Sequence, residues 1–165
     1  MYNIKLLNNI AAAGVAQLDK ACVVGEDAPD GIIVRSADMT EYAFGPELCA
    51  IARAGAGFNN IPVDRCSEEG IVVFNTPGAN ANAVRELVLC ALLISSRRII
   101  DAVEWCKTLA GDPDAETKVE KGKSQFVGPE LAGKTLGIIG LGHVGVIVAN
   151  AAVDLGMNEI GRAHV

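Results

Sequence analysis

Short runs of aliphatic residues recur along the chain, and each run leads into residues that favour turns. These runs occupy residues 4–7, 21–24, 31–36, 49–57, 71–78 and 135–142. They are continuous rather than alternating with polar residues, which is typical of strands buried on both faces of a parallel sheet. Helix-compatible segments separate the runs, so the pattern predicts an α/β fold with a doubly wound parallel sheet.

Two of the intervening segments carry clear helical signals. Segment 59–70 has Asn60 as a candidate N-cap, Pro62 in the first turn and Gly70 where the helix should end. The strongest pattern covers residues 80–109, and between Val84 and Ile94 its apolar residues crowd almost every face. A helix of about 25 residues spans close to 40 Å. We therefore expect one continuous helix, buried between two bodies of protein, that carries the chain from one domain to the next.

Segment 111–133 separates the sequence into two parts. It is rich in charged residues, glycine and proline, a composition typical of an exposed connection. We therefore expect a first domain over residues 1–81, an inter-domain helix over 82–110, a linker over 111–133 and the start of a second domain over 134–158.

Composition and charge narrow the class of protein. The net charge of −6 argues against a nucleic-acid partner, and five scattered cysteines with two histidines provide no metal-ligand cluster. We expect the cysteines to be buried, inert thiols in a reducing cytoplasm. The most apolar long run, 84–100, contains Arg85, Glu86, Arg97 and Arg98, so a membrane span is not expected.

The most specific chemical motif is Gly140-x-Gly142-x-x-Gly145, which stands between an aliphatic run and a helical run. This arrangement is typical of a dinucleotide site. Gly140 would permit a tight turn, Gly142 would let a pyrophosphate approach the backbone, and Gly145 would let helix and strand pack closely. The phosphates would sit at the helix N-terminus, on the backbone N–H groups of His143 and Val144. We therefore expect His143 to bind through its backbone rather than to act in catalysis.

Two arginines stand where predicted strands end. Arg35 and Ser36 close one aliphatic run, and Arg53 precedes the small-residue loop Gly55–Ala56–Gly57. Ligands of parallel α/β sheets collect at the carboxyl ends of the strands, where a guanidinium can bind a carboxylate or phosphate through two hydrogen bonds. The loop can add backbone N–H groups. Spacing alone leaves open that both arginines are surface ion-pair partners. We find no nucleophile–base pair in the sequence.

The chain resembles the D-isomer-specific 2-hydroxyacid dehydrogenases in four ordered segments: IIVRSADM, ARAGAGFNNIPVD, VVFNTPGANANAVRELVLCALL and LAGKTLGIIGLGHVGVIVANAA. The resemblance implies the N-terminal part of a flavodoxin-like substrate domain, followed by the first β-α unit of a Rossmann NAD-binding domain. It also implies an NAD cofactor, a small 2-hydroxy acid substrate and a homodimer or tetramer. It is strongest to members that oxidise a phosphorylated three-carbon hydroxy acid. A different hydroxy acid, such as glycerate or lactate, and a non-catalytic dinucleotide sensor of the same fold are the alternatives.

The resemblance further implies roles for the residues singled out above. The implied substrate-binding residues are Arg35, Ser36, Arg53, Gly55 and Gly57. The implied cofactor-binding residues are Ala56, Gly140, Gly142, His143, Val144 and Gly145. The catalytic His, Glu and Arg of the family have no counterpart in residues 1–165, so we assign no catalytic residue. We assign no metal site, because the cysteines and histidines form no ligand cluster.

Residues 159–165 do not fit the dinucleotide motif. The acid that binds the ribose hydroxyls is expected about 20 residues after the glycines, and the family's spacing puts Ala163 there, between Arg162 and His164. One interpretation is an NADP site in which Arg162 accommodates a 2′-phosphate. The other is that 159–165 is not native sequence, since Glu159 would lie inside a buried strand, where an unpaired carboxylate costs on the order of several kcal/mol. We expect the second, and hence an inactive fragment.

Overall fold

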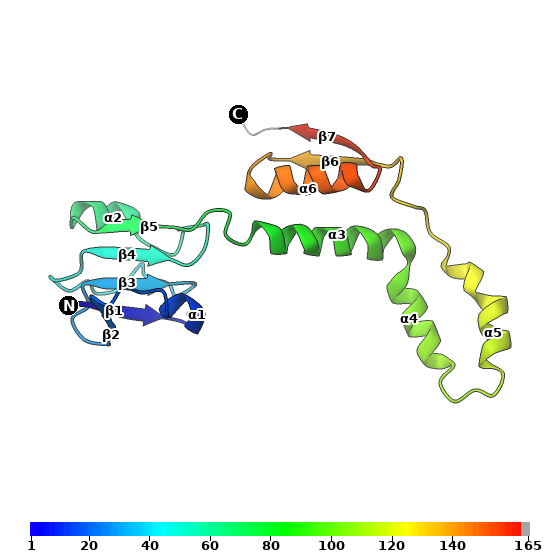
Figure 1. Ribbon diagram of the computed structural model, residues 1–165, viewed down its shortest axis with the longest axis horizontal. Helices are drawn as coiled ribbons and strands as arrows, with labels where there is room; N and C mark the ends of the chain where they lie inside the picture. Colours follow the sequence, from blue (N-terminus) through cyan, green and yellow to red (C-terminus); the bar gives the residue numbers. More distant parts are fainter. Residues whose placement is uncertain (163–165) are drawn as a thin grey trace. The chain divides into compact units, whose positions relative to one another are not determined.

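A computed structural model describes residues 1–162. The chain divides after Asn80 into two compact units, Met1–Asn80 and Ala81–Val165, and each is described by itself below (Figure 1). Among the described residues, none of the helices combines the length and apolar character that crossing a membrane requires.

The first unit is built on a five-stranded sheet with the order β2-β1-β3-β4-β5, and every neighbouring pair is parallel. The strands are β1 (Tyr2–Leu7), β2 (Cys22–Val24), β3 (Gly31–Val34), β4 (Ala50–Arg53) and β5 (Val72–Phe74). This order is that of flavodoxin-like doubly wound sheets, with the switch point between β1 and β3. Each strand lies within or overlaps one of the predicted aliphatic runs. The α/β fold class predicted from the sequence is therefore confirmed.

The centre of this sheet carries the core of the first unit. Ile32 and Val34 of β3 and Ile51 of β4 are almost completely buried, which explains why these runs are continuously aliphatic. Burying one such side chain stabilises a fold by roughly 1.5–3 kcal/mol. The carboxyl ends of β3 and β4 are therefore held by the best-packed part of the unit.

Two short helices, α1 (Ala12–Val15) and α2 (Val63–Glu68), complete the first unit. Helix α2 begins later than the sequence predicted, with Pro62 as its N-cap, and no side chain among residues 1–162 caps it. The predicted cap, Asn60, instead donates a hydrogen bond from Nδ2 to the carbonyl oxygen of Ala37 (2.8 Å). That bond ties Asn60 to the loop after β3 and keeps it from the helix. Gly70, with φ of +74°, follows the end of the helix as predicted.

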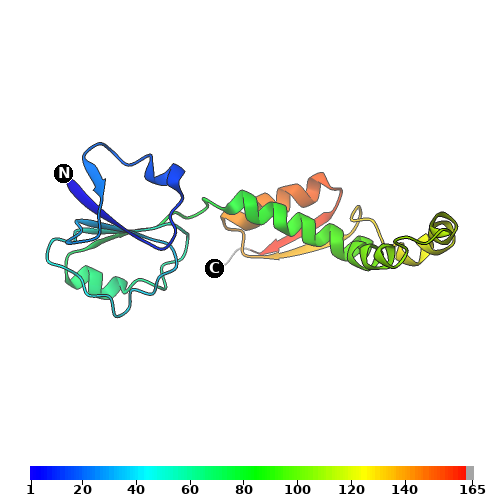
Figure 2. The same cartoon turned by 90° about the horizontal axis from the view of Figure 1, so that it is seen from below.

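The second unit contains two parallel strands and most of the helices. Its elements are α3 (Ala81–Arg97), α4 (Ile99–Thr108), α5 (Ala115–Gly122), the 3₁₀ helix η1 (Lys123–Phe126), β6 (Thr135–Ile139), α6 (His143–Asp154) and β7 (Asn158–Arg162). Helix α6 packs against β6 and β7, and α3 packs against α6 (Figures 1 and 2). The segment expected to be an exposed linker thus contains α5 and η1.

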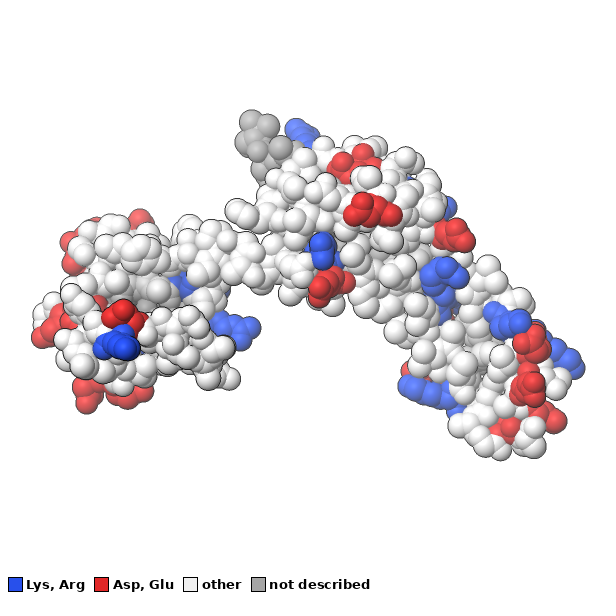
Figure 3. Space-filling view, viewed as in Figure 1, with Lys and Arg blue, Asp and Glu red and all other residues white. Residues whose placement is uncertain are grey.

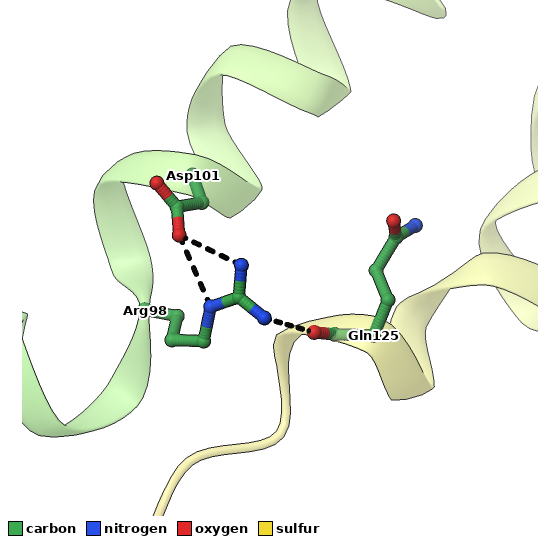
Figure 4. Close-up of polar contacts among 3 residues, drawn as sticks. All are labelled: Arg98, Asp101 and Gln125. Carbon is green, nitrogen blue, oxygen red and sulfur yellow. Dashed lines mark hydrogen bonds and ion pairs between the residues drawn. The ribbon is translucent and has the colours of Figure 1, made fainter.

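The continuous helix predicted over residues 80–109 is wrong, because the structure breaks it between α3 and α4. The break falls at Arg98, whose backbone is left-handed (φ +49°, ψ +37°). Its Nε and Nη2 donate to Oδ2 of Asp101 (3.1 and 3.0 Å), and its Nη1 donates to the carbonyl oxygen of Gln125 (2.7 Å; Figure 4). These bonds hold the bend by connecting the start of α4 to η1.

Several apolar side chains of this helical segment are not covered by the second unit itself. Leu87 on α3 is 71% exposed, and Ile99, Ile100 and Val103 on α4 are exposed as well. Helix α3 has apolar residues on most faces but packs within its unit against α6 and the start of α4, so its other faces stay uncovered there. Acidic and basic side chains are interspersed over α4 and α5 (Figure 3). Their salt bridges lie at the surface, and all partners except the half-buried Asp112 are exposed, so the pairs contribute little stability.

The cysteines depart from the expectation of buried thiols. Cys66 is buried, Cys22 is intermediate, and Cys49, Cys90 and Cys106 are exposed. Cys90 and Cys106 lie on uncovered faces of α3 and α4, and Cys49 directly precedes β4. Burial raises the pKa of the Cys66 thiol because the charged thiolate is poorly solvated there. The prediction therefore holds for Cys66 alone among the five.

Candidate ligand-binding sites

The carboxyl ends of the parallel strands meet at one edge of the first unit's sheet. Val34 at the end of β3 pairs with Arg53 at the end of β4, and the N–H of Ala54 donates to the carbonyl oxygen of Val34 (2.7 Å). The loop after β5 joins this edge, since the N–H of Thr76 donates to the carbonyl oxygen of Gly55 (3.0 Å). The structure thus brings the two predicted arginine segments together, as parallel pairing requires.

Two neighbouring cavities open at this edge. The first, of about 410 Å³, is lined by Arg35, Ala54, Gly55, Thr76, Ala79 and Asn80. The second, of about 350 Å³, is lined by Asn9, Ile10, Ala11, Gly14, Arg35 and Ala54. Arg35 and Ala54 line both cavities, and among the lining residues Arg35 alone carries a charge. Cavities of this size suit a small molecule, and the exposed guanidinium of Arg35 favours one that is anionic.

Arg53 is enclosed by its own loop. Its Nε donates to the carbonyl oxygen of Arg35 (3.1 Å). A Cβ added to Gly55 would overlap the Arg53 guanidinium, and one added to Gly57 would lie 3.6 Å from Nη1. Glycine at position 55 therefore lets the loop wrap around the guanidinium. Arg53 does not line either cavity, unlike Arg35.

Ser36 and Ala56 are held through their backbones. The N–H of Ser36 donates to Oδ1 of Asn8 (2.8 Å), and the carbonyl oxygen of Ala56 accepts a hydrogen bond from Nδ2 of Asn75 (2.8 Å). Neither asparagine was among the site residues predicted from the sequence. A signal for them exists, because Asn8 directly follows β1 and Asn75 directly follows β5, just as Arg35 directly follows β3.

The glycine motif of the second unit forms a tight strand-to-helix turn. Gly140 has a φ of +93°, which glycine adopts without steric cost. A Cβ added to Gly145 would overlap the carbonyl oxygen of Gly140, so helix and strand approach as closely as the motif predicts. A Cβ added to Gly142 would meet no described atom within 4 Å. The space in front of Gly142 is therefore open to a ligand.

The start of α6 presents its backbone to this open space. Gly142 is the N-cap, with extended backbone (φ −84°, ψ −164°), and no side chain among residues 1–162 caps the helix. His143 and Val144 begin the helix, where N–H groups have no acceptor within the helix. The helix dipole adds a partial positive charge. An uncapped, uncrowded helix start of this kind fits a diphosphate group.

Strand β7 ends beside the glycine turn. Arg162 pairs with Ile139 of β6, and its carbonyl oxygen accepts a hydrogen bond from the N–H of Gly140 (2.8 Å). The expected ribose position, Ala163, and the neighbouring His164 lie outside the described residues. Glu159 lies inside β7, as expected, and its Oε1 is buried without a hydrogen-bond partner among residues 1–162.

Comparison with known proteins identifies the family. The family described as "D-isomer specific 2-hydroxyacid dehydrogenase, catalytic domain" matches residues 7–159. The chain belongs to the D-isomer-specific 2-hydroxyacid dehydrogenases. The resemblance inferred from the four sequence segments is thereby confirmed.

Several proteins of this dehydrogenase family resemble the chain over most of its length. A hydroxypyruvate reductase of Thermotoga maritima is 43% identical over 136 residues, which cover 79% of this chain and 40% of that protein. A D-3-phosphoglycerate dehydrogenase of Methanocaldococcus jannaschii is 38% identical over 140 residues, which cover 80% of this chain and 24% of that protein. The chain thus spans well under half the length of these relatives.

One solved structure resembles this chain in both fold and sequence. The NAD⁺-bound 3-phosphoglycerate dehydrogenase of Entamoeba histolytica superposes with a TM-score of 0.70 at 30% identity, covering 98% of this chain and 53% of that one. A glyoxylate/hydroxypyruvate reductase of Sinorhizobium meliloti has a TM-score of 0.78 at 22% identity, covering 98% of this chain and 54% of that one, and supports the fold alone.

Proposed function

We propose that this chain is part of an NAD-dependent D-2-hydroxyacid dehydrogenase that oxidises D-3-phosphoglycerate to 3-phosphohydroxypyruvate, an early step toward serine. The observation that carries the proposal is the cavity edge at Arg35, an exposed cation at the carboxyl end of a parallel sheet, in a chain that also has an open glycine turn at a helix start. Family membership supports the reaction class.

The second unit would hold the dinucleotide through its backbone. The N–H groups of His143 and Val144 would bind the pyrophosphate, and Gly142 would leave room for it. Gly140 and Gly145 would keep the turn tight. When bound, the nicotinamide accepts or supplies the hydride. The E. histolytica relative is named as NAD⁺-bound, which supports NAD as the cofactor.

The first unit would hold the substrate. The Arg35 guanidinium would bind a carboxylate or phosphate, and the backbone of Ser36 and of the loop from Gly55 to Gly57 would line the rest of the site. In this proposal Ala56 meets both substrate and cofactor. The side chains around the two cavities are otherwise uncharged, so they would bind the hydroxyl and methylene groups of a small hydroxy acid.

The group that moves the substrate's proton would come from outside the lining of these two cavities. No side chain lining the two cavities can accept a proton at neutral pH, because these residues are Arg, Thr, Asn, Ile, Ala and Gly.

We further propose that residues 1–81 are part of a substrate domain and that residues 134–158 are the start of a cofactor domain. An inter-domain helical segment, 82–110, and a linker, 111–133, would lie between them in the sequence. Residues 159–165 are proposed not to be native sequence. Because no side chain that lines the cavities can accept the proton, this chain alone would bind without turnover.

The experiment separates binding from turnover. Purified chain 1–165 is titrated with NAD⁺ and with D-3-phosphoglycerate by NMR, and NADH formation is followed by absorbance with both present. We expect amide shifts near Gly142 with NAD⁺, amide shifts near Arg35 with D-3-phosphoglycerate, and no NADH. Arg35→Gln is expected to abolish the second response alone. NADH formation would overturn the proposed inactivity, and an absent response near Arg35 would overturn the substrate site.

A second candidate substrate is D-glycerate, the hydroxy acid without the phosphate. It is favoured by the 43% identity to a hydroxypyruvate reductase. The same titration decides between the two, because D-3-phosphoglycerate carries an additional anionic group. Tighter binding of D-glycerate than of D-3-phosphoglycerate to the wild-type chain would favour this second candidate.

A further inference from the structure

The peptide group that joins Arg35 to Ser36 is held from both sides. Its carbonyl oxygen accepts a hydrogen bond from Nε of Arg53 (3.1 Å), and its N–H donates to Oδ1 of Asn8 (2.8 Å). The next N–H, that of Ala37, donates to the same Oδ1 (2.6 Å). The plane of this peptide is therefore fixed by groups from β1 and β4, the two strands that flank β3.

Asn8 has an unusual backbone for a residue with a side chain. It directly follows β1 and has a φ of +71°, in the left-handed region that asparagine tolerates better than most residues. Non-glycine residues held in this region occur preferentially at ligand sites, where the surroundings determine the conformation. Asn8 also lies at the β1/β3 switch point, where doubly wound sheets bind their ligands.

We infer that Asn8 is a positioning residue for the substrate's anionic group. Its Oδ1 fixes the Arg35–Ser36 peptide, and this places the Arg35 side chain between the two cavities that it lines. Arg53 holds the same peptide from the opposite side, through its hydrogen bond to the carbonyl oxygen of Arg35. We call the contacts of Asn8 and Arg53 with this peptide the clamp on Arg35. The inference rests on the proposed function, in which Arg35 binds the substrate, and it adds two residues that act through Arg35 rather than by touching substrate.

A purely structural role for Asn8 makes a different prediction. A residue needed only for a left-handed turn is replaced by glycine without loss, because glycine adopts that backbone freely. A residue needed for its Oδ1 is not, because glycine has no acceptor. Asn8→Gly therefore separates the two roles, and Asn8→Asp restores an acceptor in a residue that also tolerates the left-handed region.

The first measurement is amide hydrogen exchange at Ser36 and Ala37 in chain 1–165. Each lost hydrogen bond changes the equilibrium by a modest factor, so losing two should speed exchange by about tenfold or more in Asn8→Gly. Asn8→Asp should keep the wild-type exchange rate. Asn3→Ala is the matched control, since the Asn3 side chain also makes a long-range bond, to the carbonyl oxygen of Asp27, but at the opposite end of β1.

The second measurement is binding of D-3-phosphoglycerate, followed by NMR titration. We expect Asn8→Gly to raise the dissociation constant by about tenfold and Asn3→Ala to leave it unchanged. Wild-type exchange in Asn8→Gly, fast exchange in Asn8→Asp, or equal affinity of wild type and Asn8→Gly would overturn the positioning role while leaving the substrate site intact. If wild type does not bind but Asn8→Gly speeds exchange, the proposed substrate is wrong and the clamp on Arg35 stands.

Discussion

Gly145 determines how closely α6 can lie against the end of β6. A Cβ at this position would overlap the carbonyl oxygen of Gly140, and it would lie 3.1 Å from the Gly140 carbonyl carbon and 3.5 Å from Cγ2 of Ile138. The first two atoms belong to the backbone of a tight turn, so they cannot rotate away as a flexible side chain would. Gly145→Ala should therefore push α6 away from the strand.

The expected magnitude follows from two opposing effects. Extra atoms in a well-packed region cost about 1–3 kcal/mol, and alanine in place of glycine inside a helix returns up to about 1 kcal/mol. The buried residues of α6, Val148, Ala149 and Ala152, would lose contact as the helix moves, so the cost should dominate. We expect the second unit to lose about 1–2 kcal/mol of unfolding free energy, which corresponds to roughly 5–30-fold faster amide exchange.

Hydrogen exchange of the α6 amides in chain 1–165 measures this directly. Gly137→Ala is the matched control, because a Cβ added to this β6 residue meets no described atom within 4 Å. We expect its exchange to match wild type or to be slower. If Gly145→Ala and Gly137→Ala exchange equally, the close approach of helix and strand is not the reason for glycine at position 145, and the reasoning is refuted.

Three further predictions follow from the described contacts. Gly142→Ala should leave the fold intact but weaken NAD⁺ binding by about tenfold in a calorimetric titration, since a methyl group would fill the open space in front of the helix. Cys66, whose pKa is raised by burial, should resist alkylation in the native protein while the exposed Cys49 reacts. The stability linked to the neutral Cys66 thiol is present below about pH 8.5 and is lost as the pH rises through the raised pKa. The pKa of Asp112 is lowered mainly by the hydrogen bond from Lys118 and to a smaller extent by a hydrogen bond from a backbone N–H. The carboxylate's contribution to stability is therefore present above about pH 3.9 and is lost as the pH falls through the lowered pKa. Lys118→Met should raise the pKa of Asp112 in a carboxyl NMR titration.

The elements that the sequence predicted well depend on local patterns. A strand buried on both faces must be aliphatic along its whole length, so the run that contains Ile32 and Val34 indicated β3 directly. The glycine motif could also be identified from the sequence, because two of its glycines meet local demands: Gly145 avoids the carbonyl oxygen of Gly140, five positions away, and Gly140 adopts a positive φ. Such constraints act between residues that are close in the sequence.

The features that the sequence did not reveal depend on distant partners. The break between α3 and α4 rests on Arg98, whose guanidinium reaches Gln125 across 27 positions of sequence. Hydrophobic periodicity continues through this point, so it predicts one helix where the structure has two. The exposure of Cys90 and Leu87 on α3 likewise depends on which faces find a packing partner, and an apolar pattern cannot state that.

The site at the sheet edge lies between these two cases, and Asn8 shows why. Its hydrogen bonds reach Ser36 and Ala37 across 28 and 29 positions, so no local pattern identifies it. Parallel topology nevertheless constrains its place, since all parallel strands deliver their next residue to the same edge. Applying the rule that selected Arg35 to every strand would have selected Asn8 after β1 and Asn75 after β5. A charged residue is readily predicted to bind a ligand. A neutral amide that positions the charged residue is found only when the residue after each strand is considered, whatever its side chain.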